Sequence, residues 1–118
     1  MQTENHNTEN LLERCLSILS DSKAHDIVNI DVSKASSLCD NAVICTGTSN
    51  RHVSAIAKRL EDKLYEYGYK HITLSGEQTG EWVIADLGEV MVHIMQDEVR
   101  RRYELDDLFN CMALGEAK

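Results

Sequence analysis

The chain has 118 residues, of which 42% are hydrophobic and 27% are charged, as expected for one globular domain. Twenty acidic residues against twelve basic ones give a formal net charge of −8. This balance argues against a nucleic-acid backbone as the main partner, and it either favours a basic protein surface or only keeps the protein soluble. No apolar run approaches the roughly 18 residues that a membrane span needs. The polar, acidic amino terminus lacks signal or transit character, so we expect a cytoplasmic protein.

The first expected element is a helix with Thr8 as its N-cap, preceded by a frayed, disordered tail over residues 1–7 and closing near residues 20–21. Residues 27–32 alternate between apolar and polar side chains, which predicts a strand with one solvated face near a sheet edge. Residues 33–40 are polar and rich in serine, which predicts a loop. The apolar face of the first helix would consist of Leu11, Leu12, Cys15, Leu16 and Leu19.

The centre of the chain reads as a strand, a tight turn, a helix and a second strand. Residues 42–46 form a short apolar run, Gly47 ends it, and Thr48 and Ser49 offer hydroxyls that can cap a following helix. Gly68 is placed to end that helix, and residues 71–74 begin another apolar run. We therefore expect a parallel βαβ unit. The helix face would consist of Val53, Ile56, Ala57, Leu60 and Leu64.

The last third predicts a flexible turn over residues 75–80 and an antiparallel hairpin of residues 82–87 and 90–95, joined at Gly88. Residues 98–112 predict one or two short closing helices. The fold class is therefore a single α/β domain over residues 8–112, with a mixed sheet of about five strands and about three helices. Residues 113–118 are expected to form a tail.

The hairpin is apolar on both sides, which suggests a binding face. Five strands spaced by about 4.8 Å make a sheet about 24 Å wide, and helices about 10 Å across cover one face and little more. Either the closing helices wrap under the second face, or part of it stays open as a partner site. Trp82 is characteristic of such interfaces, although it could equally be a core residue.

The sequence offers no catalytic arrangement that we recognise. Nucleotidyl transfer needs two or three carboxylates near a Gly-Ser turn to hold magnesium, and residues 71–74 contain no acid after the Gly47-Thr48-Ser49 turn. Asp86 stands alone, and Asp106 with Asp107 suits a solvated helix face. No nucleophile elbow occurs. We therefore expect no catalytic residue, metal or cofactor.

Several polar residues keep two interpretations. His52 either faces solvent or contributes to a partner surface, whereas His93, in an apolar strand, is expected to be a hydrogen-bonded core histidine. The run 100–102 consists of three arginines, which either pair with nearby acids (Glu104, Asp106 and Asp107) or dock onto something acidic. The cysteines lack metal-ligand spacing, so reduced and mostly buried thiols are expected; they are Cys15, Cys39, Cys45 and Cys111.

Several spaced motifs carry a resemblance to a known family. They include Asp26-Ile-Val-Asn-Ile-Asp-Val, the run Val43-Ile-Cys-Thr-Gly-Thr-Ser-Asn-Arg-His-Val, Gly80-Glu-Trp-Val-Ile-Ala-Asp-Leu-Gly-Glu-Val, Val92-His93 and Arg102-Tyr-Glu-Leu. From Asp26 to Phe109 the chain resembles the ribosomal silencing factor family, RsfS, which is related to the Iojap protein of plastids.

The resemblance implies a non-enzymatic factor that binds the large ribosomal subunit through its protein numbered fourteen. Such a factor blocks joining of the small subunit and represses translation when nutrients are scarce. It also implies a fold similar to nucleotidyltransferases without their catalytic carboxylates, and a possible homodimer when free. RNA contact would be secondary at most. The alternative is a nucleotide-binding or nucleotidyltransferase-like enzyme that uses the Gly47-Thr48-Ser49 turn.

The same resemblance places part of the partner surface on the tryptophan strand and its hairpin. The chain departs from the common family pattern at Asn41-Ala42, at Leu87 with Glu89, and at Phe109, where aromatic residues or aspartate are usual. The expected partner-binding residues are Trp82, Ile84, Asp86, Leu87, Glu89 and Met91. Four further residues are secondary candidates for the same surface: Arg51, His52, Arg101 and Tyr103.

Overall fold

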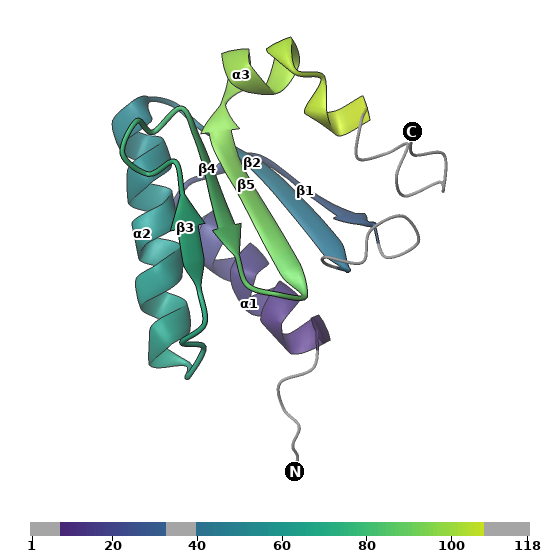
Figure 1. Cartoon of the computed structure of the whole chain (residues 1–118), viewed down its shortest axis with the longest axis vertical. Helices are drawn as coiled ribbons and strands as arrows, with labels where there is room; N and C mark the ends of the chain where they lie inside the picture. Colours follow the sequence, from purple (N-terminus) through teal and green to yellow (C-terminus); the bar gives the residue numbers. More distant parts are fainter. Residues whose placement is uncertain (1–7, 33–39, 108–118) are drawn as a thin grey trace.

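A computed structural model describes residues 8–32 and 40–107. These residues form one mixed five-stranded sheet in the order β1-β2-β5-β4-β3, with helices packed on it (Figure 1). The predicted α/β class and mixed sheet are therefore confirmed. Three expectations lie outside the described residues: the two tails, the loop over residues 33–39, and the part of the closing helices expected over residues 108–112.

Helix α1 spans Thr8–Asp21 and strand β1 spans His25–Asp31. Leu11, Cys15 and Leu19 are buried as predicted, and Ile18 joins them, because four apolar positions at helical spacing form one stripe. Strand β1 pairs only with β2, antiparallel, so it is an edge strand as its alternating pattern predicted.

Strand β2 (Asn41–Gly47) leads through a two-residue turn into α2 (Asn50–Glu66). Ser49 caps α2, because its hydroxyl accepts the His52 N–H at 3.0 Å. Beyond Tyr67, Gly68 has φ +97°, which a C′ glycine adopts without strain. All five predicted apolar residues of α2 are buried.

The turn after β2 needs glycine at position 47 although the backbone angles there are ordinary. The φ of Gly47 does not lie in the left-handed region, in contrast to Gly68, Gly76, Gly80 and Gly88. A Cβ at Gly47 would instead lie 2.8 Å from the Val53 Cγ2 atom and 3.1 Å from the Val53 backbone nitrogen. The turn therefore needs glycine because the first turn of α2 passes close to the end of β2.

The strand after α2 is displaced from the position that a simple βαβ unit implies. β3 (Thr73–Ser75) is antiparallel to β4 (Trp82–Asp86), which is antiparallel to β5 (Val90–Gln96), and β5 is parallel to β2. β3 therefore runs parallel to β2, as expected, but two strands separate them. The β4–β5 hairpin is confirmed, and α3 (Asp97–Arg102) follows β5 directly.

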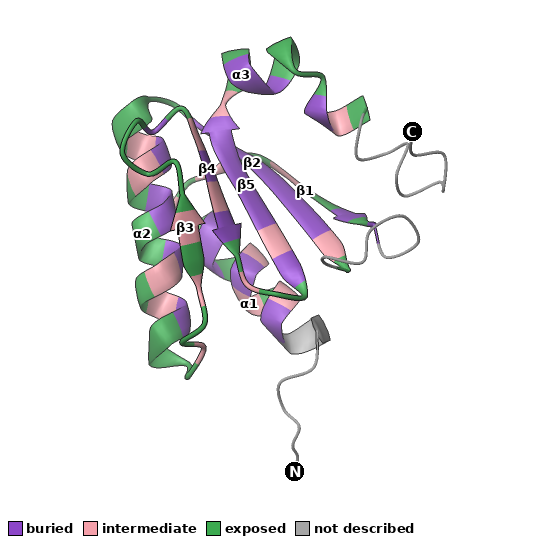
Figure 2. Cartoon of the chain, in the orientation of Figure 1, coloured by how far each residue is buried: buried purple, intermediate pink, exposed green. Residues whose placement is uncertain are grey.

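Buried residues follow the central strands and parts of α1 and α2 (Figure 2), and they form two clusters on opposite faces of the sheet. α1 and α2 cover one face and form the helix-side core, which includes Val43, Val83, Val92 and Ile94. The thiols of Cys15 and Cys45 are free and buried in it, and burial raises the pKa of each to about 12. The outer-face cluster comprises Ile30, Val32, Ala42, Ile44, Met95, Val99 and Leu105, with Val28, Trp82 and Met91 partly buried beside them.

Candidate partner-binding surface

Strand β4 presents a half-exposed apolar surface on the face away from α1 and α2. Because side chains alternate along a strand, Val83 and Ala85 enter the helix-side core, whereas Trp82, Ile84 and Asp86 lie on the other face. Asp86 pairs with Met91 across the hairpin, so both project on this face. We call Trp82, Ile84, Asp86 and Met91 the β4–β5 surface. Its three apolar members are half-buried and Asp86 is exposed.

Trp82 has defined neighbours although it remains partly accessible. Its indole Nε1–H donates to the His93 Nδ1 atom at 3.2 Å, and the centroids of the two rings are 6.1 Å apart. On another side its ring lies 5.5 Å from that of Tyr103, which is 54% exposed. Trp82 is therefore neither a fully buried core residue nor a free surface side chain.

His93 is a core histidine, as predicted. It is 5% exposed, and burial lowers its pKa to about 4. Because Nδ1 accepts the hydrogen bond from the indole N–H, the neutral imidazole ring carries its own proton on Nε2. A neutral His93 therefore holds the orientation of Trp82 at physiological pH.

Acidic residues surround the hairpin end of the β4–β5 surface. The Asp86 Oδ1 atom accepts the Gly88 N–H at 3.0 Å, which fixes the turn between β4 and β5. Glu89 is exposed in that turn, and its carbonyl oxygen accepts the N–H groups of Asp40 at 2.8 Å and Asn41 at 3.2 Å. Leu87 packs against the helix-side core instead, which separates it from Trp82.

The arginine run is divided between a buried side chain and two exposed ones. Arg100 is 7% exposed, and it donates to both carboxylate oxygens of Asp106 at 2.8 and 3.0 Å. Its Nη1 atom also donates to the Thr46 hydroxyl at 2.8 Å and to the Asp26 carbonyl at 2.9 Å. The hydrogen bond from Arg100 lowers the pKa of Asp106. The expected pairing of the arginine run with Asp106 is therefore confirmed, whereas the expectation of a solvated face was wrong for Arg100.

The remaining secondary candidates lie in two places. Arg101 and Arg102 are exposed and pair one turn back, with Asp97 at 2.9 Å and Glu98 at 3.3 Å. Tyr103 lies beside Trp82, with its ring in contact with the indole. Arg51 is exposed in the first turn of α2, the helix that packs on the other face of the sheet.

His52, in the same turn as Arg51, has a structural role. Its Nδ1 atom accepts the Thr48 N–H at 2.9 Å, so its Nε2–H donates to the Ser22 carbonyl at 3.1 Å. His52 thereby connects the start of α2 to the residue after α1. The Thr48 N–H and the His52 N–H, which a bound phosphate could use, already have partners in the turn. In residues 8–32 and 40–107, no group of three or more candidate ligands could hold a metal ion.

Comparison with known proteins identifies the family. The family model described as "Ribosomal silencing factor during starvation", RsfS, matches residues 5–117. The chain belongs to this family. It is 41% identical over 99 residues to the ribosomal silencing factor RsfS of Haemophilus influenzae, covering 84% of this chain and 97% of that protein.

Two further similarities extend the family assignment. A crystal structure of a Chromobacterium violaceum protein superposes with a TM-score of 0.84 at 36% identity, over 88% of this chain and 87% of that one. A mouse protein called "Mitochondrial assembly of ribosomal large subunit protein 1" is 30% identical over 102 residues. That match covers 83% of this chain and 44% of the mouse protein. The fold is thus shared with a bacterial relative, and the sequence similarity extends to the mouse protein.

Sequence reasoning missed two functional features of this RsfS chain. Trp82 is registered opposite Met95 on the adjacent strand, and His93 lies two residues from Met95 on the same face, within reach of the indole N–H. A hairpin register drawn from Gly88 could have revealed this hydrogen bond. Arg100 gives no such signal, because it contacts Thr46 and Asp26, which lie 54 and 74 positions away.

Proposed function

We propose that this RsfS-family protein binds the large ribosomal subunit and prevents the small subunit from joining it. It acts by occupancy of a surface and carries out no chemistry. The observation that carries the proposal is the β4–β5 surface, where half-exposed Trp82, Ile84 and Met91 are aligned beside exposed Asp86. Apolar anchors with a charged rim are typical of protein interfaces.

The proposed partner is the large-subunit protein numbered fourteen, at the face where the small subunit docks. A basic ribosomal protein would complement the formal net charge of −8 and the acids around the hairpin. Glu77, Glu81, Asp86 and Glu89 are all exposed. The family description and the name of the mouse relative, which refers to the ribosomal large subunit, support a ribosomal partner.

The protein would act in the cytoplasm, where subunits join, and would repress translation during starvation. In the described part of the chain, no helix has the length and apolar character to cross a bilayer. A homodimer of the free protein would use the same apolar surface. Dimerisation and ribosome binding would then compete for Trp82.

Sedimentation of the protein with separated large subunits, separated small subunits and joined ribosomes tests the proposal. We expect co-migration with the large subunit alone. Co-migration with joined ribosomes would contradict exclusion, because the proposed site is covered there. Co-migration with the small subunit would place the partner on the other particle.

A further inference from the structure

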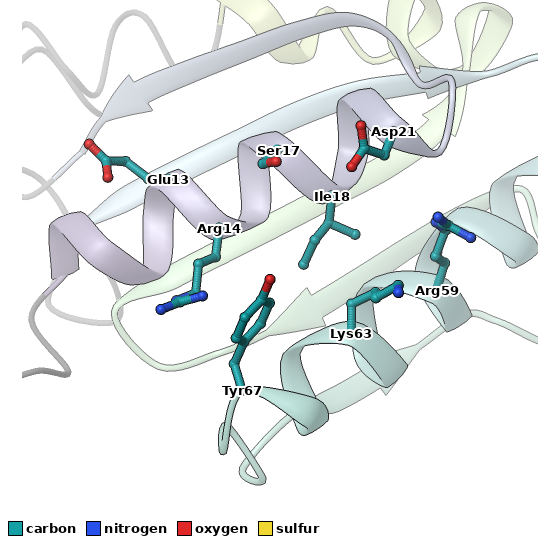
Figure 3. Close-up of a pocket in the computed structure, with 8 residues that line it drawn as sticks. All are labelled: Glu13, Arg14, Ser17, Ile18, Asp21, Arg59, Lys63 and Tyr67. Atoms are coloured by element: carbon teal, nitrogen blue, oxygen red, sulfur yellow. The ribbon is translucent and has the colours of Figure 1, made fainter.

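A second surface of the molecule carries basic side chains that the proposed function does not use. A groove of about 390 Å³ lies between α1 and α2, lined by Arg14, Arg59, Lys63 and Tyr67 among others (Figure 3). Ile18, which is 6% exposed, forms its apolar floor. Because α1 and α2 cover the opposite face of the sheet from the β4–β5 surface, the two surfaces can be occupied together.

Like Lys23, Arg51 and Lys70, the cations of this groove have no acidic partner in the described part of the chain. Arg14, Arg59 and Lys63 form no ion pair with any carboxylate in residues 8–32 and 40–107, whereas Lys58 and the run 100–102 all do. Glu13 and Asp21 also line the groove. Glu13 points away from the Arg14–Tyr67 pair, and Asp21 lies at the far end near Arg59 (Figure 3).

The spacing of these groups suits a strand of phosphates. Arg59 and Lys63 are one turn apart on α2, a rise of about 6 Å, which is the scale that separates consecutive phosphates in a nucleic-acid strand. Arg14 lies across the groove with its guanidinium 3.9 Å from the centroid of the Tyr67 ring. Tyr67 remains 54% exposed and offers a face on which a base can stack.

We propose that the α1–α2 groove binds the phosphodiester backbone of an RNA strand. The cations are spread along an open groove and do not converge on one point, which favours a polymer over a free phosphate ion. This inference goes beyond the proposed function, which requires only a protein surface. A ribosome-bound molecule would thus hold protein on one side of its sheet and RNA on the other.

The contact is expected to be weak in isolation, because the net charge of −8 repels RNA. Once the β4–β5 surface is bound, the groove would meet RNA at a high effective concentration, so a weak contact would still strengthen the complex. The arginine run, with its three ion pairs, is the poorer candidate for RNA.

Fluorescence anisotropy of a labelled single-stranded 12-nucleotide RNA, titrated with the full chain at several salt concentrations, tests the proposal. Three phosphate contacts predict a slope of about −2 when the logarithm of the affinity is plotted against the logarithm of the salt concentration. This slope corresponds to a roughly 20-fold loss of affinity between 50 and 200 mM salt. Arg59→Gln with Lys63→Gln should weaken binding at least tenfold. Lys58→Gln with Arg102→Gln removes the same charge outside the groove and should change the affinity by less than about twofold.

Three results would overturn the proposal: no binding at 50 mM salt, an equal loss in the control variant, or displacement of the RNA by inorganic phosphate at matched ionic strength. The last would assign the groove to a small anion. Trp82→Ala should bind the RNA normally while losing the large subunit. The RNA assignment and the proposed function can therefore fail independently.

Discussion

Trp82 is the single residue on which the proposed interface depends most. Its hydrogen bond to His93 and its contact with Tyr103 fix the ring without burying it completely. An indole that is oriented before binding loses little side-chain entropy when a partner covers it. Pre-organisation of this kind is what an interface anchor needs.

Trp82→Ala should therefore weaken large-subunit binding by about 2 kcal/mol or more, which is about 30-fold in Kd. The fold should persist, since Trp82 is only half-buried. Val83→Ala is the matched control: the next side chain is fully buried in the helix-side core, so it should lower the melting temperature and leave the affinity unchanged. Binding titrations and thermal melts measure both effects. An unfolded Trp82→Ala protein would show that Trp82 is a core residue.

His93 predicts a pH dependence of stability. Its pKa is about 4 in the folded protein against an ordinary 6.5, so below pH 6.5 the unfolded chain takes up a proton that the folded protein refuses. Stability should thus fall as the pH drops from about 6.5 to about 4, by up to roughly 3 kcal/mol. The lowered pKa of Asp106 acts below this window.

Urea denaturation at several pH values between 7.5 and 4.5 measures the effect of His93. His93→Gln serves as the reference, since glutamine does not titrate, and its stability should change much less over this range. Parallel pH profiles of the two proteins would mean that His93 is not the titrating group.

At the scale of elements, the turn between β2 and α2 depends on the absence of a side chain at Gly47. Gly47→Val should cost at least about 1–3 kcal/mol, because its Cβ would meet Val53 at 2.8 Å. Val53→Ala removes the nearest atom, so the double variant should be more stable than the sum of the two single losses predicts. Denaturation of all four proteins gives this coupling. If the stability losses of the two single variants simply add in the double variant, the contact with Val53 is not what requires glycine at position 47.

Helix α3 is held to the sheet by the hydrogen bonds of Arg100 as well as by the buried side chain of Val99. Arg100→Ala would leave the Thr46 hydroxyl, the Asp26 carbonyl and the Asp106 carboxylate without this donor, at a cost of about 2–3 kcal/mol. Arg101→Ala, one position on, removes an exposed pair with Asp97 and should cost less than about 1 kcal/mol. Equal losses of stability in the two variants would contradict the role assigned to Arg100.

Local patterns were sufficient to predict most elements but could not place all of them. Apolar periodicity identified α2 and the β4–β5 hairpin, because each depends on near neighbours in the chain. The position of β3 at the far edge depends on which strands insert between it and β2, and nothing within residues 71–74 encodes that choice. Arg100 was misassigned for the same reason, since its partners are distant in sequence.

On the scale of the whole molecule, the sheet separates two chemically different sides. The β4–β5 surface combines apolar side chains with exposed acids, whereas the α1–α2 groove carries unpaired cations. The prediction of an apolar outer face was possible from the two-sided hairpin pattern. The groove was not predictable, because only the packing of α1 on α2 brings Arg14 to the same groove as Arg59 and Lys63.

The rate and extent of subunit joining, followed by light scattering, test the central claim most directly. Large subunits would be incubated with the protein before small subunits are added. We expect the wild-type protein to reduce joining, and Asp86→Lys with Glu89→Lys to be at least tenfold less potent, because reversed charge slows association with a basic partner. Unimpaired joining with saturating wild-type protein, or equal inhibition by the charge-reversed variant, would contradict exclusion through the β4–β5 surface.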